Sequence, residues 1–262
     1  MPHRTIAGWL LLAAPLIALA DAPPAQSLWD QTALGLFKDA HRAFAGQPAG
    51  DREARFGEAV TLLNLQPKTD GNLDRAAALF ADIAANNPDD DLGVSARYFT
   101  ARIAQVHRFT PDLNAALAGY RELAALDSPH PLAQRAVVQL ALSELFDPGL
   151  SIDDVRSRFQ QLAARGERLT VPPVRRDFHL VMGDAALRFK LGHDVALAHL
   201  LAADRAGITR AITRRDTWLR IANLARLTGQ DDIAADYYGR FLEKFPRDSR
   251  GLMVREHLAS LR

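Results

Sequence analysis

Pairs of a small and a large apolar residue, four positions apart, recur along this chain of 262 residues. Residues four apart share one face of an α-helix, where the small side chain lets a second helix approach and the large one fills the adjoining space. The first members of successive pairs are 40, 39, 41 and 38 residues apart in the sequence. The five pairs are Ala76/Phe80, Ala116/Tyr120, Val155/Phe159, Ala196/Leu200 and Ala234/Tyr238. This near-constant period predicts stacked helical hairpins, because a single hairpin cannot bury its own apolar face.

Prolines, glycines and helix-capping residues divide the chain into short helices. After Ser27, apolar residues recur at steps of three and four, and no stretch alternates as a strand would. Asp or Ser often follows a breaker, and such side chains accept hydrogen bonds from the free N–H groups of a helix start. The pattern predicts helices near residues 28–45, 52–65, 72–86, 90–108, 112–126, 130–146, 152–165, 174–190, 194–206, 210–228, 231–245 and 250–261.

The stretch from Arg215 to Asp248 resembles a tetratricopeptide repeat. Its matching positions are Trp218, Ile221, Ala222, Gly229, Ala234, Tyr238 and Pro246. Two positions depart from the family pattern, since Ala225 stands where the family prefers an aromatic residue and Phe241 where it prefers a small one. A second, weaker match contains Leu63, Ala76, Phe80 and Pro88. The resemblance covers roughly residues 52–248 and is strong only at its two ends, because the middle units have a period near 40 that also fits HEAT-like repeats.

The resemblance implies an all-α, right-handed superhelical solenoid of about five stacked hairpins, whose first helices line a concave face. On this interpretation residues 21–51 form an N-terminal helix and linker, and residues 52–248 form the repeats. Residues 249–262 form a capping helix that shields the last hairpin.

Residues 1–20 have the pattern of a secretory signal peptide. Arg4 supplies a positive charge, an apolar stretch from Ile6 to Leu19 follows, and Ala18-Leu19-Ala20 ends in the small residues that signal peptidases prefer. The stretch is short for a membrane span and Pro15 interrupts it. We therefore expect cleavage after Ala20 and a periplasmic or secreted mature protein with no further membrane-spanning segment.

Composition and motifs exclude several classes of function. The chain has no cysteine, which excludes disulfides and thiolate metal sites. Its 32 basic and 31 acidic side chains do not have the strong positive excess of a general nucleic-acid binder. No metalloprotease, serine-hydrolase or phosphate-loop motif occurs, and the histidines are scattered. We expect no catalytic, cofactor or metal site, and a protein that is not an enzyme.

Three arginines fall at equivalent places near the end of the first helix of their units, and they are Arg108, Arg188 and Arg226. Asn223 precedes Arg226 by three residues, so both share a helix face. The resemblance implies that such Asn and basic side chains hold a partner peptide, since arginine binds carboxylates bidentately. The alternative interpretation is that these arginines are solvated surface charges.

Charge is unevenly distributed along the chain. Residues 21–150 carry 11 basic and 17 acidic side chains, whereas residues 151–226 carry 14 basic and 8 acidic ones. The densest basic run contains Arg205, Arg210, Arg214, Arg215, Arg220 and Arg226. Such a field steers oppositely charged partners, and it can equally drive head-to-tail self-association.

Two functional hypotheses follow. In the first, the chain is a non-enzymatic scaffold or adaptor of the cell envelope or periplasm that binds a peptide or partner protein on its concave face. In the second, it is an accessory module of an envelope or polysaccharide assembly machinery, and its arginine-rich face contacts an acidic glycan or lipid surface. Binding that weakens steeply with salt and needs no protein partner would favour the second.

Overall fold

The computed structural model describes residues 25–261, and these residues fold entirely into helices and turns. The expected signal peptide and its cleavage after Ala20 lie outside the described residues. The helices are α1 (Ala25–Ala33), α2 (Phe37–Ala45), α3 (Arg52–Asn64), α4 (Asp70–Asn86), α5 (Asp91–Arg102), the π-helical turn η1 (Ile103–His107), α6 (Leu113–Ala125), α7 (Pro131–Leu145), α8 (Ile152–Gly166), α9 (Pro172–Arg188), α10 (His193–Arg205), α11 (Ala211–Leu227), α12 (Asp231–Lys244) and α13 (Gly251–Ala259).

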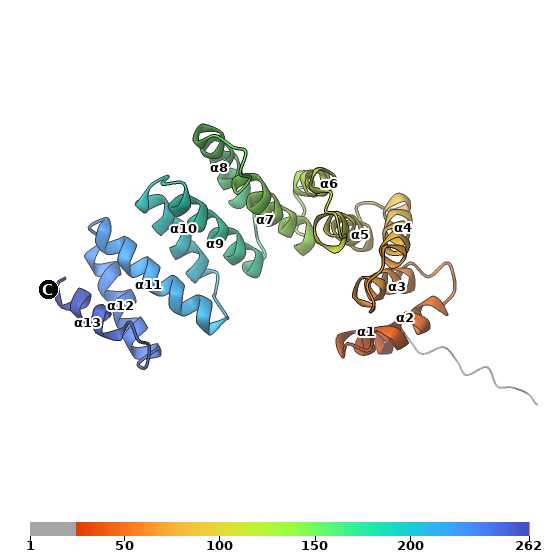
Figure 1. The fold of residues 1–262 in the computed structure, drawn as a ribbon, viewed down its shortest axis with the longest axis horizontal. Coiled ribbons are helices and arrows are strands. Elements are labelled where there is room, and N and C mark those ends of the chain that lie inside the picture. Colours follow the sequence, from red (N-terminus) through yellow and green to blue (C-terminus); the bar gives the residue numbers. More distant parts are fainter. Residues whose placement is uncertain (1–24, 262) are drawn as a thin grey trace, which may run out of the picture.

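The helices form consecutive hairpins that follow one another in an arc from α1 to α13 (Figure 1). The five predicted hairpins are α3/α4, α5/α6, α7/α8, α9/α10 and α11/α12, and α13 packs against α12. In the middle of the arc α6 and α8 lie on its outer side, while α5 and α7 lie nearer its inner side (Figure 1). The predicted all-α helical solenoid is confirmed.

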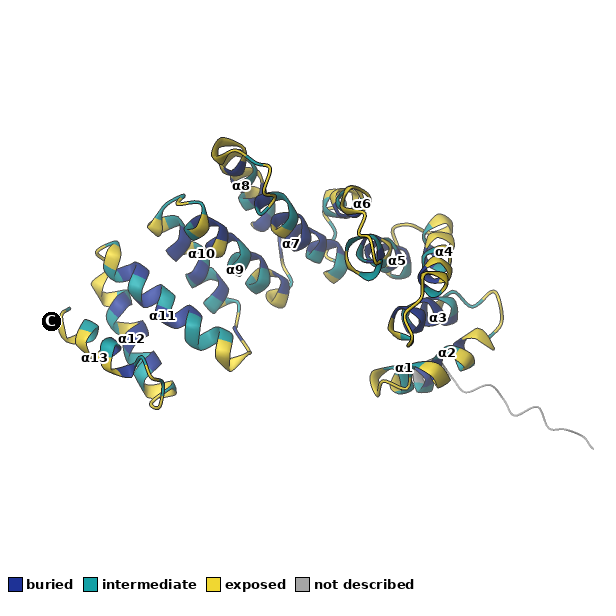
Figure 2. Ribbon diagram, viewed as in Figure 1, coloured by how far each residue is buried: buried dark blue, intermediate teal, exposed yellow. Residues whose placement is uncertain are grey.

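The small and large apolar pairs occupy equivalent places in these hairpins. All five lie on the second helix of a hairpin, and none of the ten side chains is more than 7% exposed. Buried residues run along the arc wherever neighbouring helices face one another, and exposed residues gather at the turns (Figure 2). The period read from the sequence therefore corresponds to the packing unit of the core.

The N-terminal region differs from the sequence prediction. Instead of one helix over residues 28–45, α1 and α2 form a short additional hairpin, and α2 packs against α3. The break between them contains Gly35, whose φ of +79° is a left-handed conformation that glycine adopts without the strain a Cβ would bring. Ala40 and Phe44 on α2 are 0% and 2% exposed and form a sixth small and large pair.

No helix among residues 25–261 is both long enough and apolar enough to cross a membrane.

Candidate functional site

Two of the candidate arginines, Arg108 and Arg220, pair with acidic residues on neighbouring hairpins. Arg220 on α11 pairs with Asp184 on α9, and Arg108 after η1 pairs with Asp74 on α4 at 2.7 Å. The partners are 36 and 34 residues apart in sequence, which is about one repeat. Each pair is largely exposed and therefore contributes little stability by itself. These two arginines connect adjacent hairpins, and each is already engaged by a carboxylate.

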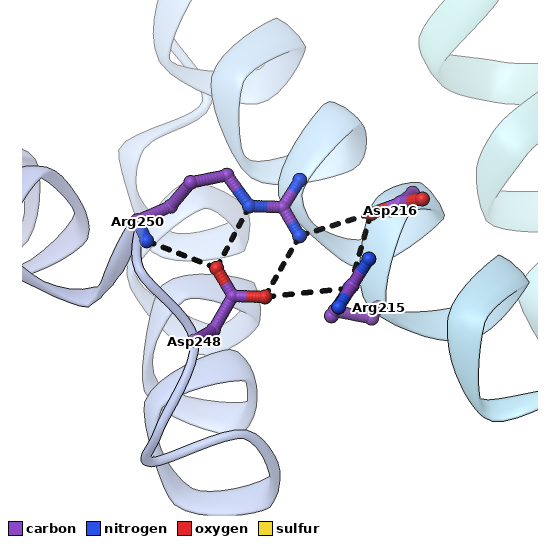
Figure 3. A network of polar contacts seen from close by, with 4 residues as sticks. All are labelled: Arg215, Asp216, Asp248 and Arg250. Carbon is purple, nitrogen blue, oxygen red and sulfur yellow. Dashed lines mark hydrogen bonds and ion pairs between the residues drawn. The ribbon is translucent and has the colours of Figure 1, made fainter.

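Arg215 belongs to a denser network at the junction between α11 and α13 (Figure 3). Arg250 donates to Asp248 at 2.8 Å and to Asp216 at 2.9 Å, and Arg215 lies 3.3 Å from Asp248. Hydrogen bonds from the Arg250 side chain and backbone hold the pKa of Asp248 well below its usual range. The four charges satisfy one another and fix the start of α13 against α11.

The Arg214 side chain is also engaged within the chain. Its Nε and Nη2 atoms donate to the backbone carbonyl of Ile208 at 2.8 and 2.5 Å, which anchors the loop between α10 and α11.

Asn223 and Arg226 lie together beside Tyr238, as their spacing on α11 predicts. The Tyr238 hydroxyl donates to Oδ1 of Asn223 at 2.6 Å and lies 3.2 Å from Nδ1 of His257 on α13. The Nε atom of Arg226 is buried and has no hydrogen-bond partner among the described residues. The Asn223 side chain thus already supports a contact between α11, α12 and α13.

Arg188 is exposed at the end of α9, where its guanidinium carbon lies 5.8 Å from the ring centroid of Phe189. Arg108, Arg188 and Arg226 each stand at or just beyond the end of the first helix of a hairpin, but they belong to different hairpins. The structure does not gather them into one site.

Arg205 and Arg210 of the basic run have no side-chain hydrogen bond or ion pair among residues 25–261, and Arg210 borders a hollow. The hollow has a volume of about 170 Å³ and lies between α9 and α11, the first helices of two successive hairpins. Arg176, Asp177 and Leu180 of α9 form one wall, and residues 208–210 with Thr213 form the other. Within residues 25–261 no hydrogen bond or ion pair involves the exposed Arg210 side chain. We refer to this hollow as the α9/α11 slot.

A second feature that the sequence did not reveal is a contact between two histidines. His179 on α9 and His199 on α10 approach to 2.9 Å between their Nδ1 atoms, so one imidazole donates an N–H and the other accepts it. Phe159 on α8 packs edge-on against His199 at a centroid distance of 5.4 Å. Burial, followed by the charge of His179, lowers the pKa of His199 to about 4. The pair is a hydrogen-bonded contact between α9 and α10, and the described residues contain no cluster of three or more potential metal ligands.

The lowered pKa of His199 predicts that the free energy of unfolding decreases in mild acid. An unfolded histidine titrates near pH 6.5, so between that pH and about 4 the unfolded chain binds a proton that folded His199 does not. The contribution of neutral, buried His199 to the free energy of unfolding is therefore complete above pH 6.5, and it is lost as the pH falls. Urea unfolding at pH 7.5 and 5.0 should show the wild type losing about 1 kcal/mol more than His199→Gln, after allowance for solvent screening. His193→Gln, at an exposed position, should behave as the wild type. Equal losses in all three proteins would contradict the assignment.

Comparison with known proteins gives a family match over one segment and a similar solved structure. A sequence profile of the tetratricopeptide repeat matches residues 216–248, which include most of α11 and all of α12. No curated protein matches the chain. Among solved structures, the chain is similar to a thermophilic TPR protein of Thermus thermophilus, with 21% identity, a TM-score of 0.43, and coverage of 80% of this chain and 98% of that chain.

The matched segment is the same unit whose residues most resemble the family, and the hairpins before it repeat its packing pattern. The family match thus identifies a tetratricopeptide repeat at residues 216–248, which is the last helical hairpin before α13.

Proposed function

We propose that this chain is an exported, non-enzymatic scaffold of the cell envelope or periplasm that binds a partner protein along the wall formed by its first helices. Proteins with TPR folds generally mediate protein–protein interactions, and stacked hairpins present an extended surface suited to a peptide or a partner's helix. The observation that carries the proposal is the α9/α11 slot, where an arginine without a partner borders a hollow between two such helices.

Three titratable groups with strongly shifted pKa values support a role without catalysis. Tyr120 donates to Gln105 at 2.8 Å, Tyr237 donates to Asp204 at 2.8 Å, and His199 pairs with His179. Burial is the main cause of the pKa shift in all three residues. Each of these groups therefore serves a contact between helices of the solenoid.

The paired arginines favour a protein partner over an acidic glycan or lipid surface. Binding to a polyanion draws on many free cations at once, yet Arg108, Arg215 and Arg220 are each engaged with a carboxylate. Among the exposed cations without an ion pair, Arg188 and Arg210 lie on different hairpins. A protein partner that meets a few defined positions fits this arrangement better.

Site-specific photocrosslinking in the exporting cell tests the proposal. A benzophenone amino acid at Thr213, in the slot, should give an ultraviolet-dependent adduct of one defined mass. The same amino acid at Gln160, which is exposed on α8, should not. Intact mass of the protein from the periplasmic extract should correspond to a chain that begins at Asp21. Equal adducts from both positions, or adducts from neither, would contradict the proposal. So would a chain that keeps residues 1–20 and stays in the cytoplasm.

A further inference from the structure

An ion pair joins α9 and α11 beyond the α9/α11 slot. Arg220 on α11 pairs with Asp184 on α9, and these residues lie seven positions beyond Thr213 and Asp177, which border the slot. Seven residues of an α-helix rise about 10 Å. The ion pair thus lies about two helical turns beyond these lining residues. The slot itself has a volume of about 170 Å³, which exceeds that of several water molecules.

The electrostatics of the slot are positive. Asp177 is the acidic residue in its lining, and this carboxylate is already engaged by Arg176 at 2.8 Å and by Arg135 on α7 at 2.9 Å. Arg210 has no partner among the described residues. Because two arginines surround the single carboxylate and a third has none, the slot favours an anionic ligand and repels a metal cation.

The remaining lining determines what kind of anion fits. Leu180 is half-buried and Ile208 is 3% exposed, so both offer apolar surface beside the charge. Thr209 and Thr213 supply hydroxyl groups on the same side as Arg210. This combination matches a carboxylate carried on a short aliphatic stem, in which the charged end meets arginine and hydroxyl donors and the methylene groups meet Leu180 and Ile208.

We propose that the α9/α11 slot binds the side-chain carboxylate of a glutamate residue in the partner protein, with Arg210 as its main donor. The proposal rests on the proposed function and specifies the chemistry that the partner must present. A glutamate provides a carboxylate and two methylene groups, whereas glutamine has nearly the same shape without the charge.

The test uses a small probe in place of the unidentified partner. N-acetyl-glutamate amide, which carries one carboxylate and neutral ends, is titrated into isotopically labelled protein at pH 7, and N-acetyl-glutamine amide serves as the neutral control. We expect half-saturation in the low millimolar range, which is usual for so small a ligand. The backbone amide signals of Thr209, Arg210 and Thr213 should shift with the glutamate probe and remain unchanged with the glutamine probe.

Two variants that each remove one positive charge distinguish binding at a defined site from attraction by the general positive field. Arg210→Gln should weaken binding of the glutamate probe at least tenfold. Arg205→Gln, at an exposed position on α10 outside the slot, should change it less than twofold. No shift with the glutamate probe, an equal response to both probes, or equal losses in the two variants would overturn the proposal. If photocrosslinking at Thr213 still captures a partner in the Arg210→Gln variant, the glutamate assignment is wrong, whereas the proposed scaffold function is not contradicted.

Discussion

Replacing Gly166 by alanine should lower the free energy of unfolding by about 2–3 kcal/mol, because the last residue of α8 lies against a ring that has no room to move. A Cβ at this position would lie 2.1 Å from Cε1 and 2.6 Å from Cζ of Phe178, whose side chain is 0% exposed in the core of α9. Either the ring or the end of α8 must shift, and both lie at the junction of two hairpins. Urea unfolding followed by circular dichroism measures the loss.

Gly239 provides the matched control, because it stands inside α12 and a Cβ there would meet nothing within 4 Å. Gly239→Ala should raise the free energy of unfolding by about 0.5–1 kcal/mol, since alanine favours the helical backbone more than glycine does. The same chemical change thus has opposite effects at the two positions. A loss at both, or no loss at Gly166, would show that the approach of α8 to α9 is looser than the structure indicates.

The repeat could be predicted because it depends on residues close together in sequence. Ala196 and Leu200 share a helix face by their spacing alone, and their burial follows wherever hairpins stack. The sixth pair, Ala40 and Phe44, follows the same rule, and its first member precedes Ala76 by 36 residues. The sequence pattern did not predict the hairpin that contains this pair, because α1 and α2 have only nine residues each. Together they resemble one longer helix, which is interrupted at Gly35.

The pairing of the charges was not predicted, although the sequence contains a signal for it. Arg250 and Asp216 are 34 residues apart, and Arg135 and Asp177 are 42 apart. Separations near one repeat place two side chains at neighbouring hairpins, so an arginine and a carboxylate at that distance are candidates for an ion pair. Net charge summed over a long segment hides such pairs and overstates the free positive surface.

The α9/α11 slot depends on features that local spacing does not encode. Arg210 is one of six arginines in the basic run, and nothing in its sequence context separates it from Arg214. The difference is that Arg214 folds back onto the carbonyl of Ile208, while Arg210 stays exposed beside the hollow. The loop geometry between α10 and α11 decides which arginine is free.

Replacing Asp204 by asparagine should cost about 2–3 kcal/mol of unfolding free energy, because this carboxylate accepts from three donors on the next hairpin. Trp218 Nε1 donates to it at 2.7 Å, Tyr237 Oη at 2.8 Å and Arg240 Nη2 at 3.2 Å. Burial and the bond to Asp204 raise the pKa of Tyr237 to about 12, so the hydroxyl remains a donor. Asparagine has one acceptor oxygen, and its amide N–H₂ group would face a donor where the second carboxylate oxygen stood. At least one partner is left unsatisfied.

Asp236 is the control for the same substitution, because it pairs with the same arginine. It lies 3.6 Å from Arg240 with a side chain that is 60% exposed, whereas the Asp204 side chain is 11% exposed. Asp236→Asn should cost less than about 0.5 kcal/mol, the usual value of an exposed pair. Arg240 lies 4.3 Å from the Trp218 ring centroid, so the contribution of Trp218 to tryptophan fluorescence during urea unfolding reports on this junction. If the two substitutions cost the same, the carboxylate of Asp204 contributes only its charge, and its hydrogen bonds do not hold α10 against α11 and α12.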